Sequence, residues 1–205
     1  MSKPRWTAAW TGALFLVCAG AAPARAQTEY FARLGAVGSA KLLRDRGLDD
    51  ITVRPSIAPM LALGASLPLG PRGYRLGLEG SLASGKFHSS DGGLDTELGT
   101  LRTASLLLQL QGPVVPALRW TVGLGGIRYW PSDERGIFLL GGTTRLLAGA
   151  GADYRRPVLP RWDLVTSLRY DFHRFMTDQL AARGFSQTQG VSRVSLSIGL
   201  SRSPG

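Results

Sequence analysis

Hydrophobic and polar residues alternate strictly between Trp162 and Phe172. The even-numbered positions carry mainly apolar or aromatic side chains, whereas the odd-numbered positions include Asp163, Arg169 and Asp171. Successive side chains of a β-strand point to opposite faces of its sheet. The segment therefore predicts a strand with one apolar face and one charged face.

The same alternation recurs in seven other segments. The eight predicted strands are residues 30–40, 53–67, 74–84, 101–111, 118–130, 138–154, 162–172 and 191–200. Each is about as long as the roughly 9–11 residues that a tilted membrane-spanning strand needs, or longer. Pro55 and Pro59 interrupt the second segment, and proline cannot donate to a β-ladder. We expect a bulge there, or a strand that begins after Pro59.

The N-terminus has the features of an export signal. Lys3 and Arg5 precede an apolar stretch over residues 6–22, and Ala24-Arg25-Ala26 forms a small-x-small cleavage site. We therefore expect residues 1–26 to be a cleaved secretory signal peptide and residues 27–205 to form one domain. No later stretch offers 18 uninterrupted apolar residues, so no transmembrane helix is predicted.

Eight alternating strands behind an export signal predict an all-β fold, an eight-stranded antiparallel up-and-down transmembrane β-barrel in the outer membrane. The connections support this prediction, because short and long ones alternate. The short ones are residues 68–73, 112–117 and 155–161, and the mostly longer, polar ones are 41–52, 86–100, 131–137 and 173–190. Outer-membrane barrels keep short turns in the periplasm and longer loops outside.

Aromatic residues occupy both ends of the rows predicted to face outward. They are Tyr30, Tyr74, Trp120, Tyr154 and Trp162 at the expected periplasmic ends, and Trp130, Phe138, Tyr170 and Phe172 at the other ends. Amphipathic rings prefer the boundary between membrane and water. The two sets therefore predict two membrane-interface belts.

The rows predicted to face inward carry many charges. They are Arg75, Glu79, Arg119, Arg145, Asp153, Asp163, Arg169, Asp171 and Arg193. Eight strands leave an interior just wide enough for side chains to fill, and buried charges must pair. We expect a charge network that fills the lumen, with Arg119, Asp153 and Asp163 converging near the periplasmic end. The alternative is a narrow pore in which arginines favour anions.

The net charge and the cysteine content limit which partners and which chemistry the mature chain can have. Without the three basic residues of the expected signal peptide, the formal net charge falls from +10 to +7. The basic residues are scattered and nearly all arginine, so we expect anionic lipopolysaccharide as a partner and no nucleic acid. Cys18 is the one cysteine and lies inside the signal, which excludes disulfides and thiol chemistry from the mature chain.

Histidine and serine raise the alternative of a lipid-modifying enzyme. His173 follows Asp171, and Ser167, Ser186 or Ser192 could in principle complete a hydrolytic triad. A triad is recognised by geometry, so we assign no catalytic residue and expect no enzyme. His88 and His173 lie far apart without ligand spacing, so we expect no metal or other cofactor.

Over residues 27–205 the chain resembles the small eight-stranded outer-membrane barrels, the OmpA-transmembrane, OmpX and OmpW-like group. The resemblance rests on the signal, the strand count, the loop alternation and the aromatic belts. It implies a structural or surface protein with extracellular loops; a narrow porin-like conduit and a lipid-modifying enzyme are alternatives. It also implies contact with outer-membrane lipid, lipopolysaccharide and the barrel-assembly machinery, and leaves the oligomeric state open. Members usually end their last strand with an aromatic residue, whereas here Leu200 closes it.

Overall fold

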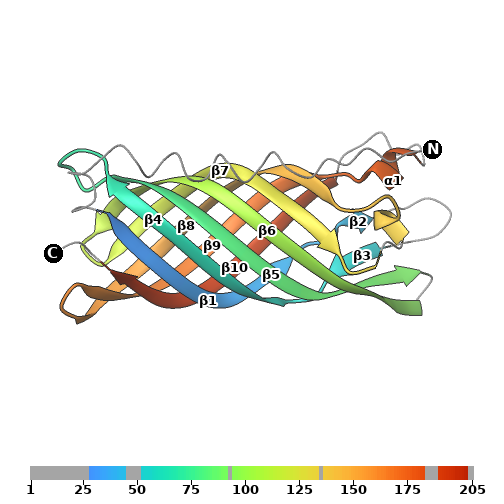
Figure 1. Cartoon of the computed structure of the whole chain (residues 1–205), viewed down its shortest axis with the longest axis horizontal. Helices are drawn as coiled ribbons and strands as arrows, with labels where there is room; N and C mark the ends of the chain where they lie inside the picture. The colour runs from blue at the N-terminus through green and yellow to red at the C-terminus, as the bar shows by residue number, and fades with distance from the viewer. Residues whose placement is uncertain (1–27, 45–51, 92–93, 134–135, 183–188, 203–205) are drawn as a thin grey trace, which may run out of the picture.

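Eight long strands close into a ring (Figure 1). The computed structural model describes residues 28–44, 52–91, 94–133, 136–182 and 189–202. The strands of the ring are β1 (Glu29–Ser39), β4 (Ala58–Pro68), β5 (Arg75–Asp91), β6 (Leu94–Val115), β7 (Leu118–Pro131), β8 (Thr143–Leu159), β9 (Trp162–Phe175) and β10 (Gln189–Arg202). Each pairs antiparallel with the next, and β10 closes the ring on β1 from Tyr30↔Arg202 to Ser39↔Arg193. The predicted eight-stranded antiparallel barrel is confirmed.

The two faces of each strand differ sharply in exposure. On β10, Val194, Leu196 and Ile198 are 50–58% exposed on the outside of the barrel. The intervening Arg193, Ser195 and Ser197 are only 4–5% exposed. This inside-out arrangement is the one expected of a barrel that has lipid around it and polar side chains in its lumen.

Five expectations fall partly or wholly on residues that the structure does not describe. The expected signal peptide, residues 1–26, lies outside the described residues, and so do 45–51, 92–93, 134–135 and 183–188 of the four expected longer connections. Among the described residues, no helix is both long enough and apolar enough to cross a membrane.

The second predicted strand is divided in two. Residues 52–55 form β3 (Thr52–Pro55), which pairs with β5 and with the short β2 (Leu43–Arg44). Two residues separate β3 from β4, which begins at Ala58. The strand thus begins before Pro59, which lies inside β4 opposite Ala36. The break inverts the alternation, so Val53 is buried and Arg54 is exposed. The alternation over residues 53–67 predicts that Arg54 faces the lumen, and this prediction was wrong.

Several strands run further than their sequence pattern indicates. Most of residues 86–100, expected as a loop, continue β5 and β6 as a hairpin beyond the barrel wall. The strand β8 runs on to Leu159, so Arg155 belongs to a strand and not to a turn. At its other end β8 begins at Thr143, because Phe138 belongs to the short 3₁₀ helix η3 (Gly136–Phe138). A short helix, α1 (Asp178–Ala182), lies in the last connection.

Candidate functional site: a lumen filled by charge pairs and an apolar plug

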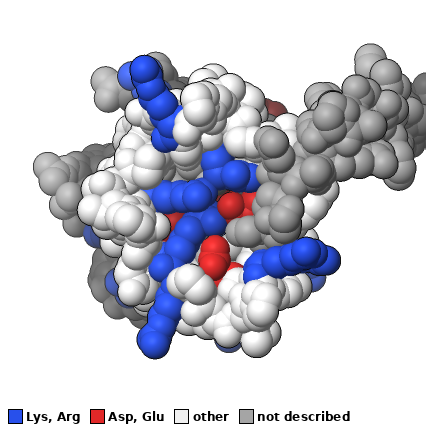
Figure 2. Space-filling view, turned by 90° about the vertical axis from the view of Figure 1, so that its left-hand side faces the viewer, with Lys and Arg blue, Asp and Glu red and all other residues white. Residues whose placement is uncertain are grey.

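The two ends of the barrel differ in their connections. Three short turns follow β4, β6 and β8 at one end, which we call the short-turn end; the other is the long-loop end. Figure 2 faces the short-turn end and shows basic side chains crossing the mouth, with acidic ones between them. In outer-membrane barrels the short turns lie on the periplasmic side.

Three arginines surround one carboxylate at the short-turn end. Glu29 is 2% exposed, and its Oε1 accepts a hydrogen bond from Nη1 of Arg155. Its Oε2 lies 3.5 Å from Nε of Arg75 and 3.7 Å from Nη1 of Arg119. Arg75 also donates from Nε to the hydroxyl of Ser66 at 2.8 Å. This cluster ties β1 to strands on the opposite side of the ring.

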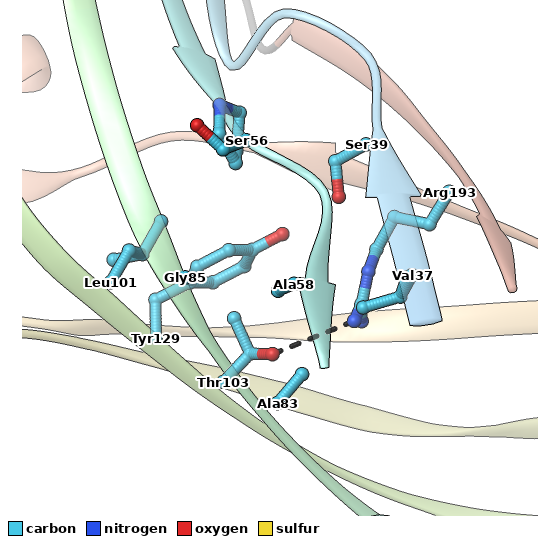
Figure 3. A pocket seen from close by; sticks show the side chains of 11 residues that line it. Val37, Ser39, Ser56, Ala58, Ala83, Gly85, Leu101, Thr103, Tyr129 and Arg193 are labelled. Atoms are coloured by element: carbon cyan, nitrogen blue, oxygen red, sulfur yellow. Dashed lines mark hydrogen bonds between the residues drawn. The ribbon is translucent and has the colours of Figure 1, made fainter. Parts of the chain in front are cut away.

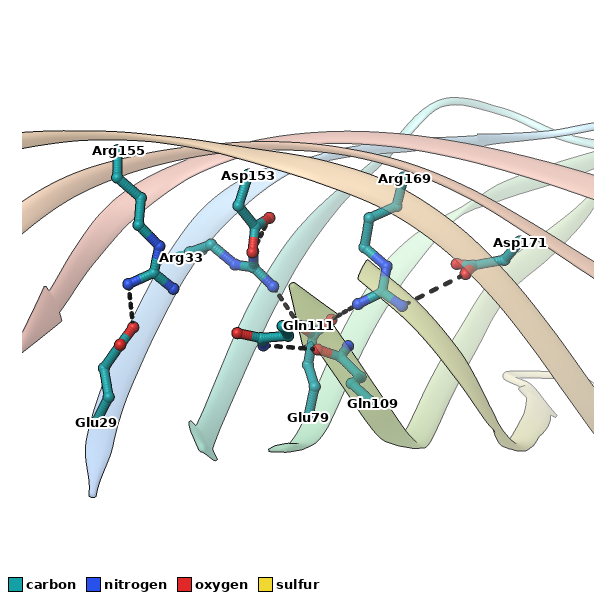
Figure 4. A network of polar contacts seen from close by, with 9 residues as sticks. All are labelled: Glu29, Arg33, Glu79, Gln109, Gln111, Asp153, Arg155, Arg169 and Asp171. Atoms are coloured by element: carbon teal, nitrogen blue, oxygen red, sulfur yellow. Dashed lines mark hydrogen bonds and ion pairs between the residues drawn. The ribbon is translucent and has the colours of Figure 1, made fainter. Parts of the chain in front are cut away.

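A second cluster occupies the middle of the lumen (Figure 4). Arg33 is hydrogen-bonded to Glu79 and, at 3.1 Å, to Oδ1 of Asp153. The other oxygen of Glu79 accepts a bond from Nη1 of Arg169 at 2.7 Å, and Nη2 of Arg169 lies 3.8 Å from Oδ1 of Asp171. These side chains are almost fully buried. Opposite charges therefore compensate one another in a place where isolated charges would be very unfavourable.

An aromatic ring packs beside this cluster. The guanidinium of Arg33 lies 4.6 Å from the ring centroid of Phe31, within the range of a cation–π contact. Gly64 on the neighbouring strand makes room for the ring, because a Cβ at that position would lie 2.2 Å from Cζ of Phe31. The charges and the ring together fill this level of the lumen.

Above the charges, the long-loop half of the lumen holds an apolar plug. Its buried members are Leu42, Val53, Phe87, Leu101, Leu107, Ile127, Tyr129, Ile137, Phe138, Leu147, Phe175, Leu180 and Val191. Phe138 packs edge-on against both Phe87 and Phe175, with 5.9 Å between ring centroids in each pair. Phe138 is thus fully buried in the plug, and its expected place in the outer aromatic belt was wrong, because η3 turns it into the lumen.

The long-loop segments that carry the plug are fastened to each other. The hydroxyl of Thr177 donates to the carbonyl oxygen of Ile137 at 2.6 Å, which joins the start of α1 to η3. Nε of Arg145 donates to the carbonyl oxygen of Met176 at 2.9 Å. These bonds hold the segments across the top of the barrel.

A small cavity lies where the charges meet the plug (Figure 3). It has a volume of about 20 Å³, and its lining includes Val37, Tyr129 and Arg193. Nη2 of Arg193 lies 3.5 Å from the hydroxyl oxygen of Thr103 across it. A buried water needs at least about 10–15 Å³, so this cavity has room for about one water and not for a solute.

The predicted lumen residues do not all pair as expected. Asp153 pairs with Arg33, Arg119 approaches Glu29, and no ion pair joins Asp163 to any described residue. Arg119 and Asp153 are cross-strand neighbours on β7 and β8, but no ion pair joins Asp163 to them, so the expected convergence of all three was wrong. Arg75, Glu79, Arg169 and Asp171 lie in the two clusters, whereas Arg145 and Arg193 bond to a carbonyl and a hydroxyl.

Sequence reasoning missed three members of the clusters. Glu29 precedes the predicted start of the first strand by one residue, and Arg155 lay in an expected turn. Arg33 was placed on the inward row but not assigned to the network. Its position in the middle of an otherwise small or apolar row was the signal that could have identified it.

The remaining aromatic residues lie on the outside of the barrel. Tyr30, Tyr74, Trp130, Tyr154, Tyr170 and Phe172 are exposed, and Trp120 and Trp162 are partly exposed. Tyr74 and Trp120 meet edge-on at the short-turn end, with 6.2 Å between centroids. The guanidinium of Arg202 lies 5.9 Å from the centroid of Trp162. These positions are compatible with two belts at the membrane surfaces.

His173 lies inside the plug, next to Tyr129. Its Nε2 is 2.8 Å from the hydroxyl oxygen of Tyr129. Ser192 is hydrogen-bonded to Tyr170 instead, and Ser186 lies outside the described residues. Within the part of the chain that the structure describes, no serine is hydrogen-bonded to a histidine, and no group of three or more His, Asp or Glu side chains is placed to hold a metal ion.

No family model matches the chain, and no curated protein matches it. Several solved structures are similar to the chain. Neisserial surface protein A is 11% identical with a TM-score of 0.52, over 86% of this chain and 96% of that one. The outer-membrane protein AlkL is 13% identical with a TM-score of 0.53, over 86% and 90%. OprG from Pseudomonas aeruginosa is 15% identical with a TM-score of 0.48, over 86% and 95%.

These likenesses concern the fold. Together with the closed ring, the apolar outer wall and the polar lumen, the likenesses to Neisserial surface protein A and AlkL show the fold of a small eight-stranded outer-membrane β-barrel.

Proposed function

We propose that the protein is a structural and surface barrel that is closed to solutes, with its long-loop end presented outside the cell. The observation that carries the proposal is the filling of the lumen: two charge clusters in one half and the apolar plug in the other. Lipid and lipopolysaccharide surround the wall. We also propose that the barrel-assembly machinery inserts the protein into the membrane. We propose no enzymatic activity.

The charge clusters close the lumen because they cross it. Each buried guanidinium or carboxylate that moved aside would leave its partner uncompensated, which makes spontaneous opening unfavourable. The plug adds a second barrier, because an apolar constriction excludes water and ions by dewetting.

The long-loop end carries a small sheet that extends beyond the wall. It is built from β2, β3 and the outer parts of β5 and β6, in the order β2-β3-β5-β6. Lys86 and Glu97 form an exposed ion pair on it, with 2.9 Å between Nζ and Oε2. In this orientation the sheet is the surface that other molecules outside the cell would meet.

The lysines of the chain permit a direct test of this orientation. They occur at positions 3, 41 and 86 only, so both lysines of the mature protein belong to the long-loop end. An amine-reactive probe on a polymer too large to cross the outer membrane should label Lys41 and Lys86 in intact cells, as read by peptide mass spectrometry.

A matched control places an amine at the other end. Arg72 is exposed in the first short turn, so the lysine of Arg72→Lys should be labelled only after the envelope is disrupted. Labelling of this lysine in intact cells, with Lys41 and Lys86 protected, would overturn the proposed orientation.

A further inference from the structure

A groove of about 590 Å³ crosses the outer wall from β1 to β7. This size falls within the roughly 300–1,000 Å³ of typical ligand pockets. The strands that form it lie side by side on the near face of Figure 1. Because the groove lies outside the ring, an occupant would come from the membrane and not from the lumen.

Strand register arranges the lining of the groove in two rows. Leu34, Leu61 and Leu82 are neighbours across β1, β4 and β5, and they form an apolar row. Ser84, Arg102 and Trp130 are neighbours across β5, β6 and β7, one step closer to the long-loop end. The groove is therefore apolar at one level and cationic at the next.

No described acid is paired with the arginine of the cationic row. Arg102 is exposed and forms no hydrogen bond or ion pair with any described residue. Arg128, also exposed, extends along the wall so that its guanidinium lies 5.3 Å from the ring centroid of Trp130. Of the nearby acids, Glu97 is already paired with Lys86, and Asp133 hydrogen-bonds through Oδ2 with the hydroxyl of Ser132.

A lipid-facing arginine is unfavourable in a barrel unless it lies near the headgroups, where an anion can compensate it. An acyl chain matches the leucine row, and a phosphate matches the two guanidinium groups, which bind phosphate through charge-assisted hydrogen bonds. The long-loop end faces the outer leaflet, whose lipid carries both groups. We infer that this groove binds one acyl chain of lipid A, with a lipid A phosphate held by Arg102 and Arg128.

This site depends on the barrel lying in the outer membrane with its long loops outside, and not on the closure of the lumen. A conducting lumen would not contradict the lipid site, and loss of lipid binding would not contradict the closed lumen. Labelling of Lys41 and Lys86 separately reports the orientation.

Native mass spectrometry of the refolded barrel, released from detergent with added diphosphoryl lipid A, tests the inference. The wild type should retain one lipid A. Arg102→Gln should weaken retention roughly tenfold, because one charge-assisted phosphate contact is removed. Ser84→Phe should weaken it as well, because the ring fills the groove between the leucine row and Arg102.

Two controls match these variants. Arg156→Gln removes an exposed arginine from the short-turn end, and Ala150→Phe adds the same ring to an exposed position of β8, between Val122 and Tyr170 and away from the groove. Both should retain lipid A like the wild type. Gel mobility before and after boiling establishes that each variant is folded.

Four results would overturn the inference. The first is equal retention by Arg102→Gln and the wild type, and the second is equal loss in Arg156→Gln. The third is equal retention of phosphatidylglycerol or of dephosphorylated lipid A, which would show a general lipid contact. Displacement by millimolar inorganic phosphate alone would likewise contradict a site that depends on the acyl chain.

Discussion

Nη1 of Arg169 donates a hydrogen bond to Oε1 of Glu79 at 2.7 Å, from one wall of the barrel to the opposite one. The two residues belong to β9 and β5, which lie four strands apart in a ring of eight. Their bond therefore spans the diameter of the lumen. A barrel that conducts solutes would need this bond to open.

Glu79→Gln should destabilise the barrel by about 3–5 kcal/mol, because two buried guanidinium groups lose their shared carboxylate. Urea unfolding in detergent micelles or lipid vesicles measures the change. Lys86→Gln, which breaks an exposed ion pair, is the matched control and should change stability by no more than about 1 kcal/mol. Equal effects of the two variants would show that the lumen cluster does not hold the barrel together.

Gly64→Ala should destabilise the barrel by about 1–3 kcal/mol, because the new methyl group meets the ring of Phe31 and also lies 2.6 Å from the carbonyl oxygen of Leu78. Phe31→Leu in the same chain should recover part of the loss by giving the methyl group room. The test is a double-mutant cycle of unfolding free energies. Strictly additive effects of the two substitutions would contradict the contact.

Phe138→Ala should cost about 3–5 kcal/mol, because it leaves a cavity in the centre of the plug. Leu146 is 81% exposed on the outer wall, so Leu146→Ala creates no cavity and should cost much less. The midpoints of thermal unfolding, followed by gel mobility, compare the two variants. If Phe138 were in the outer belt, as its sequence position predicted, both substitutions would have similar small effects.

The aromatic belts predict the depth of the three tryptophans of the mature chain. Trp120 and Trp162 lie at the short-turn end and Trp130 lies at the long-loop end, all on the outer wall. In variants that keep a single tryptophan, fluorescence should be quenched most by lipids brominated near the headgroup. Stronger quenching by bromines near the bilayer centre would show that these tryptophans do not lie in belts at the membrane surfaces.

Within an unbroken strand, the direction of a side chain follows from the sequence, because alternation is a local property of a strand. Glu79 and Arg169, both on rows predicted to face inward, are each 4% exposed. Which lumen residues meet could not be predicted in this way. Their relative heights depend on strand tilt and on the stagger accumulated around the ring. Arg33 and Asp153, from β1 and β8, meet for this reason alone.

The ends of the strands were the other source of error. Pro157 made residues 155–161 look like a turn, although proline is tolerated where β8 pairs irregularly near its end. Arg155 was lost from the predicted lumen as a result. The break before β4 had a similar effect on Arg54, because a break in the alternation puts the side chains on its two sides out of register by one residue, which turns those before it to the other face.

The most direct test of a closed lumen is single-channel recording of the wild-type barrel in planar lipid bilayers. Insertion is confirmed first by a gel shift on boiling of the protein recovered from the same preparation. The closed barrel should show no discrete conductance steps, because the Arg169–Glu79 bond and the apolar plug both cross the lumen. Steady, reproducible steps from the folded barrel would contradict it and would establish a conduit.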